Sequence, residues 1–175
     1  RRKTTPDHVV HTKRMGLALA WMAAFWQAGS RSLVRVYYVH PPPSDLAIIT
    51  DASPWGLGGV LVVSQSEVVL EGFSSPLTTR DELELNIQIG DPAGQGVVEM
   101  LAILVALKLW TRFFRQRTRI PSLLADPRSA LGVARKFSSP TPELNHLGSE
   151  LSLRLEIHDV ADPKSAHVPG KLNDL

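Results

Sequence analysis

The chain has 175 residues, enough for one domain of ordinary size with some extra, and 43% of them are hydrophobic, which excludes a disordered protein. The formal net charge is only +2, so the placement of the charges matters more than their sum. There is no cysteine, which excludes disulfides, thiolate metal sites and cysteine nucleophiles, and we expect an intracellular protein, cytoplasmic or nuclear.

The first part of the chain reads as a basic segment, a helix, a strand and a stiff spacer. Residues 12–28 are expected to be helical, because apolar side chains recur there at helical spacing, at Met15, Leu19, Met22 and Trp26. Residues 32–39 are rich in Val and Tyr, as strands are, and the run HPPPS at 40–44 follows. We place the domain boundary there, between 1–45 and 46–175. No uninterrupted apolar run reaches the roughly 18 residues of a membrane span, so we expect no membrane partner.

The second part predicts a mixed sheet with helices. The expected strands lie at 46–50, 57–63, 67–73 and 119–126, with a last strand or loop at 156–162. The expected helices lie at 97–114, 128–137 and 142–155, and residues 74–96 read as irregular. The order β-β-β-α-β-α-α-β predicts an α/β fold, a five-stranded mixed sheet with three antiparallel strands, then α/β crossovers, and helices on both faces.

Three acidic residues stand at corresponding places in this arrangement. Asp51 and Asp126 each end an expected strand, and Glu99 lies near the start of the helix expected at 97–114. Function in α/β sheets collects at the carboxyl ends of the strands. Three neighbouring carboxylates repel one another unless a cation lies among them, and oxygen ligands select Mg²⁺ or Mn²⁺. The pattern therefore predicts a metal site for phosphodiester cleavage.

Each acid also has an ordinary structural explanation, which the sequence leaves open. Asp51 precedes SPWG and can form an Asx-turn. Asp126 precedes a proline and can cap the helix expected at 128. Glu99 can be a first-turn acid that the helix dipole favours.

Four motifs occur in the order of a known family: ITDASPWGLGGVL, VVEMLAILVAL, LLADPRSAL and AHVPGKLNDL. Residues 46–175 resemble the ribonuclease H domain of a retroelement reverse transcriptase. The resemblance implies a ribonuclease H-like fold, with Asp51, Glu99 and Asp126 as the catalytic acids that bind two Mg²⁺ ions, or Mn²⁺ as a substitute, and cut the RNA strand of an RNA–DNA hybrid. It also implies that His167 is a mobile-loop histidine that helps proton transfer or product release; a surface histidine without a role is the alternative.

The resemblance carries further expectations about the ends of the chain. The family's last motif continues to a fourth catalytic aspartate, whereas this chain ends at Leu175, so we expect a domain truncated at its C-terminus. Residues 1–45 resemble the end of the connection region, which implies the polymerase and connection domains of the same polyprotein as partners, in a retroelement particle or complex. The alternative function is a non-catalytic ribonuclease H-like module that binds nucleic acid or acts as a scaffold.

Two regions are candidates for holding the hybrid. Residues 108–119 carry five basic residues, Arg112 and Arg115 among them, with no acid and with interleaved aromatic residues. Basic residues hold phosphates and aromatic rings stack on bases, although Trp110, Phe113 and Phe114 can equally belong to the core. The backbone near Ser53, Gly56 and Gly58 is expected to approach RNA closely. Further candidates are Arg128, Ser129 and Asn145.

Overall fold

The computed structural model divides into two compact units, Arg1–Tyr37 and Tyr38–Leu175, each of which is described by itself. The residues that the structure describes are 15–16, 19–20, 22–23, 26, 43–114, 120–125, 128–158, 160 and 162–167. Of Arg128, Ser129 and His167 only the backbone is described. The strand expected at 32–39 lies outside these residues.

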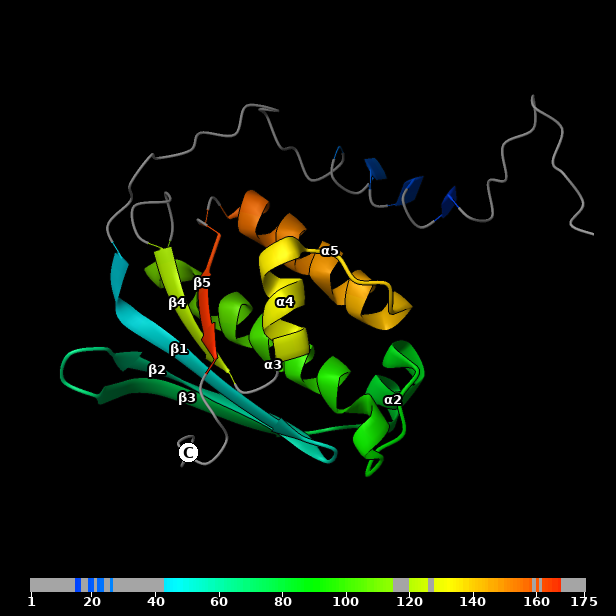
Figure 1. The fold of residues 1–175 in the computed structure, drawn as a ribbon, viewed down its shortest axis with the longest axis horizontal. Helices are drawn as coiled ribbons and strands as arrows, with labels where there is room; N and C mark the ends of the chain where they lie inside the picture. The colour runs from blue at the N-terminus through cyan, green and yellow to red at the C-terminus, as the bar shows by residue number, and fades with distance from the viewer. Residues whose placement is uncertain are drawn as a thin grey trace, which may run out of the picture. The chain divides into compact units, whose positions relative to one another are not determined.

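The larger unit is built on a five-stranded sheet in the order β3-β2-β1-β4-β5 (Figure 1). Its strands are β1 (Pro43–Ser53), β2 (Gly56–Val63), β3 (Val68–Pro76), β4 (Ile120–Ala125) and β5 (Lys164–His167). Both β1–β2 and β2–β3 are antiparallel pairs, whereas β4 lies parallel to β1 and to β5. The mixed α/β sheet predicted from the sequence is confirmed.

The central strand β1 is longer than the expected 46–50. It begins at Pro43, inside the run read as a spacer, because a proline is tolerated at the first position of a strand. At the other end it continues past Thr50 to Ser53. Side chains alternate between the faces, so Ile48, Thr50 and Ala52 are buried, and Asp51 between the last two is exposed.

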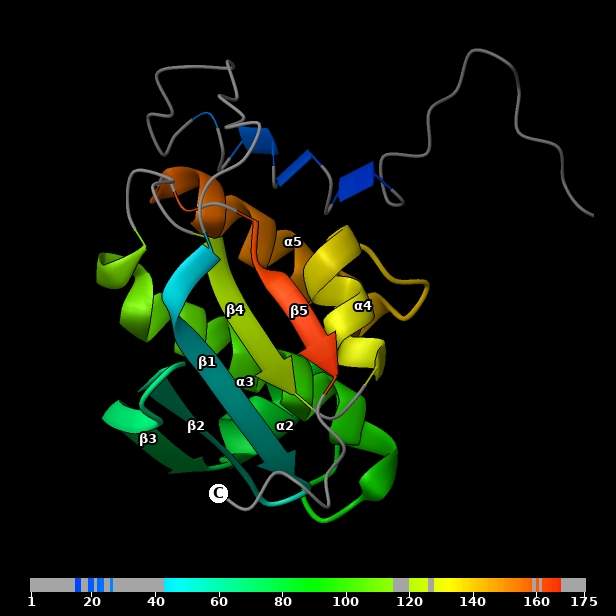
Figure 2. The same cartoon turned by 60° about the vertical axis from the view of Figure 1, so that its left-hand side comes forward.

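The helices of this unit are α2 (Thr79–Leu85), α3 (Gln95–Trp110), α4 (Arg128–Lys136) and α5 (Pro142–Ile157), with the short 3₁₀ turns η1 (Pro92–Gly94) and η2 (Thr111–Phe113). Apolar side chains of all four helices join one core with Ile48, Leu61 and Leu123 of the sheet. In both views the helices α3, α4 and α5 lie over one face of the sheet (Figures 1 and 2). Helices were expected on both faces; the helices α3, α4 and α5 of this unit share one face (Figures 1 and 2).

The helix α3 forms the centre of this core. It is apolar on most of its circumference, and nine of its residues are buried, Met100, Ile103 and Ala106 among them. By length and composition the stretch Pro92–Phe113 is apolar enough to cross a membrane, and it is the only described helix of which this is true. A search for uninterrupted apolar runs does not find it, because Glu99 breaks the run. Half of its most apolar window is buried inside the protein, and the core helix of a soluble protein passes the same test.

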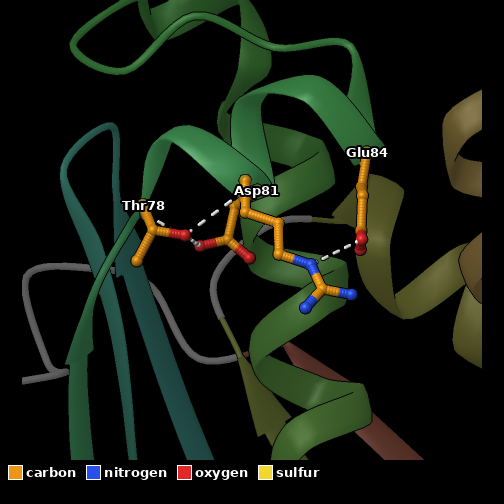
Figure 3. A network of polar contacts seen from close by, with 4 residues as sticks. Thr78, Asp81 and Glu84 are labelled. Carbon is orange, nitrogen blue, oxygen red and sulfur yellow. Dashed lines mark hydrogen bonds and ion pairs between the residues drawn. The ribbon is translucent and has the colours of Figure 1, made fainter.

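The segment 74–96, read as irregular, contains α2 and η1. The helix α2 begins with a capping box, in which Thr78 Oγ1 accepts a hydrogen bond from the N–H of Asp81 and the Asp81 carboxylate accepts one from the N–H of Thr78 (Figure 3). An ion pair between Arg80 and Glu84 lies on the same helix. The capping motif was present in the sequence and was overlooked.

The segment 156–162, expected to be a last strand or a loop, is the end of α5 followed by a loop in its described residues. The helix α5 continues to Ile157, and β5 forms at Lys164–His167 rather than at 156–162. Its register pairs Ala125 of β4 with His167.

The smaller unit contains part of the helix expected at 12–28. The residues of that range that the structure describes are helical, and the apolar ones among them, Met15, Leu19, Met22 and Trp26, are exposed.

Candidate active site

Asp51 is presented by β1, the central strand. Its Oδ1 accepts a hydrogen bond of 2.9 Å from the N–H of Ala52, the next residue, whereas an Asx-turn requires the residue after that. The turn into β2 is instead made by Ser53, whose Oγ accepts from the N–H of Trp55 at 3.3 Å. The Asx-turn explanation of Asp51 is therefore wrong, and its exposed carboxylate is available for another role.

Glu99 is a charged residue in the protein core, with 2% of its surface exposed. The helix α3 begins at Gln95, so Glu99 lies in the second turn, and no acid occupies the first turn. A first-turn interaction with the helix dipole therefore does not explain it. Burying a carboxylate costs free energy unless the surroundings compensate its charge, and such a position indicates a specific role.

Gln95 joins Glu99 to Ala52, the residue after Asp51, and it was not among the residues predicted from the sequence. Its side-chain amide donates to the carbonyl oxygen of Ala52 at 2.9 Å and to Oε1 of Glu99 at 3.4 Å. The same Ala52 gives its N–H to Asp51. A continuous chain of contacts, Asp51–Ala52–Gln95–Glu99, thus joins the end of β1 to the buried carboxylate. The spacing of Gln95 four residues before Glu99 on one helix face was a signal in the sequence.

The remaining two predicted catalytic residues belong to neighbouring strands: Asp126 follows β4 in the sequence, and His167 ends β5. Asp126 lies outside the described residues; Ala125, the residue before it, ends β4 beside β1. The backbone of His167 lies at the end of β5, paired with Ala125, so it belongs to a strand and not to a loop. Within the described residues, no group of three or more His, Cys, Asp or Glu side chains is placed to hold a metal ion.

An open cleft of about 610 Å³ adjoins Asp51, between the ends of β1, β2 and β3. Gly58 pairs with Asp51 on one side and with Ser74 on the other, which places these three residues in one row across the sheet. Several residues that line the cleft are glycines, so no side chains fill it there. At Gly56 there is no room for one, because a Cβ would lie 2.9 Å from the carbonyl oxygen of Ser75. Asp51 is the one charged residue among those that line the cleft in the described structure.

Comparison with solved structures identifies the architecture. Ribonuclease H1 from the halophilic archaeon Halobacterium salinarum superposes with a TM-score of 0.50 at 18% identity, over 74% of this chain and 89% of that one. LC11-RNase H1, solved in complex with an RNA/DNA hybrid, gives a TM-score of 0.52 at 17% identity, over 74% and 88%. The chain has the ribonuclease H fold.

Other comparisons add little to this fold assignment. A foamy viral protease-reverse transcriptase in complex with double-stranded DNA matches with a TM-score of 0.36 at 15% identity, over 96% of this chain and 34% of that one, which is too low to support a common fold. No protein-family model and no curated protein matches the chain.

Within the ribonuclease H fold, three predicted substrate residues line the cleft with Asp51: Ser53, Gly56 and Gly58. Asn145 lies on α5, where its Oδ1 accepts from the N–H of Ser139 and so holds the loop between α4 and α5. Arg128 and Ser129 begin α4, and Arg115 lies outside the described residues.

Arg112 is engaged at the other end of α3 from Glu99. It forms an ion pair with Glu71 of β3, and its guanidinium lies 4.9 Å from the centre of the Phe113 ring. Trp110 donates to the second oxygen of Glu71 at 2.9 Å and is 1% exposed, and Phe114 is fully buried. These aromatic residues belong to the core, so the structure does not support a stacking role for them.

Proposed function

We propose that this protein is a metal-dependent endonuclease that hydrolyses the RNA strand of RNA–DNA hybrids, as part of a retroelement reverse transcriptase. The observation that carries the proposal is the chain of contacts from Asp51 through Ala52 and Gln95 to the buried Glu99, at the end of the central strand of a ribonuclease H fold. The structural neighbour LC11-RNase H1, which was solved with an RNA/DNA hybrid, supports the choice of substrate.

The donors that this site offers suit a hard cation. The carboxylates of Asp51, Glu99 and Asp126 would hold two Mg²⁺ ions, or Mn²⁺ in their place, because these ions prefer oxygen ligands. A carboxylate as buried as that of Glu99 is costly to keep ionised, and a divalent cation beside it offsets that cost. When bound, such ions activate a water molecule and stabilise the leaving oxygen of the phosphodiester.

The protein's own residues supply position and access. Gln95 holds Glu99 against the end of β1, while Gly56 and Gly58 leave room for a nucleic-acid backbone beside Asp51. His167 ends β5, the strand next to β4, and we assign it a part in proton transfer or product release.

The proposal extends to partners and location. The exposed apolar stripe of Met15, Leu19, Met22 and Trp26 supports packing against the polymerase and connection domains of the same polyprotein. Such a protein would act inside the cell, in the retroelement particle or complex.

The test is cleavage of a hybrid labelled on its RNA strand in the presence of Mg²⁺. Asp51→Asn and Glu99→Gln are expected to reduce the cleavage rate at least about 100-fold, because several kcal/mol of transition-state stabilisation are lost with a metal ligand. Glu84→Gln is the matched control, since Glu84 is an exposed glutamate in an ion pair on α2, and it should cleave at the wild-type rate.

The alternative is a non-catalytic module that binds nucleic acid or acts as a scaffold. It predicts hybrid binding that weakens with salt, with no cleavage above background. Equal rates for the wild type, Asp51→Asn and Glu99→Gln would favour this module and reject the endonuclease.

A further inference from the structure

Trp55 is a large aromatic side chain with 64% of its surface exposed, at the rim of the cleft that contains Asp51. It lies with Pro54 in the two-residue turn that joins β1 to β2, in which Ser53 pairs with Gly56. Neither Pro54 nor Trp55 has a positive φ, whereas both turn types that hairpins of this length prefer need one at the first of these two positions, so the turn is of neither type. Contacts from outside the hairpin therefore hold Trp55 in place.

These contacts fix both the backbone and the ring of Trp55. Its carbonyl oxygen accepts from the N–H of Leu77 at 2.8 Å, and that of Pro54 accepts from the N–H of Gly90 at 2.9 Å. Gly90 has a φ of +87°, and a Cβ added there would lie 3.3 Å from the indole Nε1, so the Nε1 edge of the ring lies beside Gly90 with no side chain between them. The neighbouring Ile89 donates its N–H to the Glu82 carboxylate of α2 at 2.6 Å, which anchors this support.

An exposed aromatic ring that already rests against backbone on one side, next to glycines of the cleft, is suited to pack against a ligand, because less of its conformational freedom is lost on contact. Across the cleft, Ser74 and Ser75 are exposed on β3 and offer hydroxyl groups. Bases inside a duplex are already stacked on both faces, so a ring that approaches from a groove meets the sugars of the backbone.

We propose that Trp55 packs against a sugar of the hybrid duplex next to the strand that enters the cleft, as a substrate-binding residue beside Asp51. This inference rests on the proposed function for the choice of ligand. It assigns Trp55 to binding and not to the chemical step.

The test is the dissociation constant of a fluorescently labelled RNA–DNA hybrid, measured by anisotropy with Ca²⁺ in place of Mg²⁺ so that the strand is not cut. Trp55→Ala should weaken binding at least about fivefold, in line with the loss of an aromatic contact to nucleic acid. Trp55→Phe keeps a ring and should stay within about threefold of the wild type. Val69→Ala, which shortens an exposed side chain at the far end of β3, is the control and should bind as the wild type does.

Tryptophan fluorescence gives a second readout that a merely structural role would not move. Addition of the hybrid should quench the wild-type emission, and Trp55→Phe should lose this quenching while it still binds. If the wild type cleaves the hybrid but Trp55→Ala binds it with unchanged affinity, the inference is wrong and the proposed function stands. If the wild type binds but does not cleave, and Trp55→Ala binds more weakly, the inference stands and the endonuclease fails. Absence of any hybrid binding by the wild type overturns both.

Discussion

Removal of the Gln95 amide tests whether the contacts around Glu99 position it for function. The hydrogen bond of 2.9 Å to the Ala52 carbonyl has ordinary length and contributes about 1 kcal/mol, and the contact of 3.4 Å to Glu99 contributes less. Gln95→Ala should therefore lower the free energy of unfolding by only about 1–2 kcal/mol. Loss of a group that orients a metal ligand typically costs about 10–100-fold in metal affinity or activity.

The assay is Mg²⁺ titration by calorimetry, combined with hybrid cleavage over a range of Mg²⁺ concentrations. Gln95→Ala should bind Mg²⁺ about 10-fold more weakly or worse, and high Mg²⁺ should restore part of its cleavage rate. Gln88→Ala makes the same substitution at an exposed glutamine and should match the wild type in both measurements. If Gln95→Ala binds Mg²⁺ and cleaves as the wild type does, the positioning role of Gln95 is refuted.

Two further predictions concern the fold that carries the site. The pKa of Glu143 is lowered by a hydrogen bond from its own backbone N–H at the start of α5 and by one from the side-chain amide of Asn86. These interactions of the ionised Glu143 therefore stabilise the fold at neutral pH, and this stabilisation is lost as the pH falls through the lowered pKa. In urea unfolding from neutral pH to about pH 3, Glu143→Gln should lose part of the acid sensitivity of the wild type, and an unchanged pH profile would show that this pair contributes nothing. At the contact of α4 with α5, a Cβ at Gly148 would lie 2.8 Å from Val133 Cγ1 and 3.1 Å from the backbone of Phe137, so Gly148→Ala should destabilise by about 1–3 kcal/mol. Gly132→Ala on α4 meets nothing within 4 Å and should stabilise by up to about 1 kcal/mol, so equal thermal shifts for the two variants would contradict the packing described.

The parts of the fold with strong local patterns were predictable from the sequence. The apolar run of β1 and the long apolar helix α3 are both where the sequence indicates them, because burial on one or more faces demands a continuous apolar pattern. The mixed topology follows from the order of these elements.

Errors of a few residues at the ends of elements changed the interpretation of the site. The helix α3 begins at Gln95 and not at 97, which moves Glu99 from the first turn to the second and removes its explanation by the helix dipole. The same shift brings Gln95 onto the helix, one turn before Glu99. A pattern of apolar residues does not report these two polar residues, because their roles come from contacts with the end of β1.

The last strand could not be predicted from its own residues. Lys164–His167 have little preference for extended structure, whereas the residues around 156 carried the pattern taken for a strand. β5 forms because β4 offers an edge for parallel pairing, which is a tertiary effect. The place of Trp55 on Gly90 is likewise a contact between segments far apart in the sequence, and no local motif indicates it.

The most direct test of the central claim, that the acids at the end of β1 form a metal site, is a crystal structure of the protein soaked in Mn²⁺, with anomalous diffraction recorded. An anomalous peak is expected within coordination distance of the carboxylate oxygens of both Asp51 and Glu99, at about 2.0–2.3 Å. Peaks that lie only elsewhere on the protein, or none at all at saturating Mn²⁺, would contradict it.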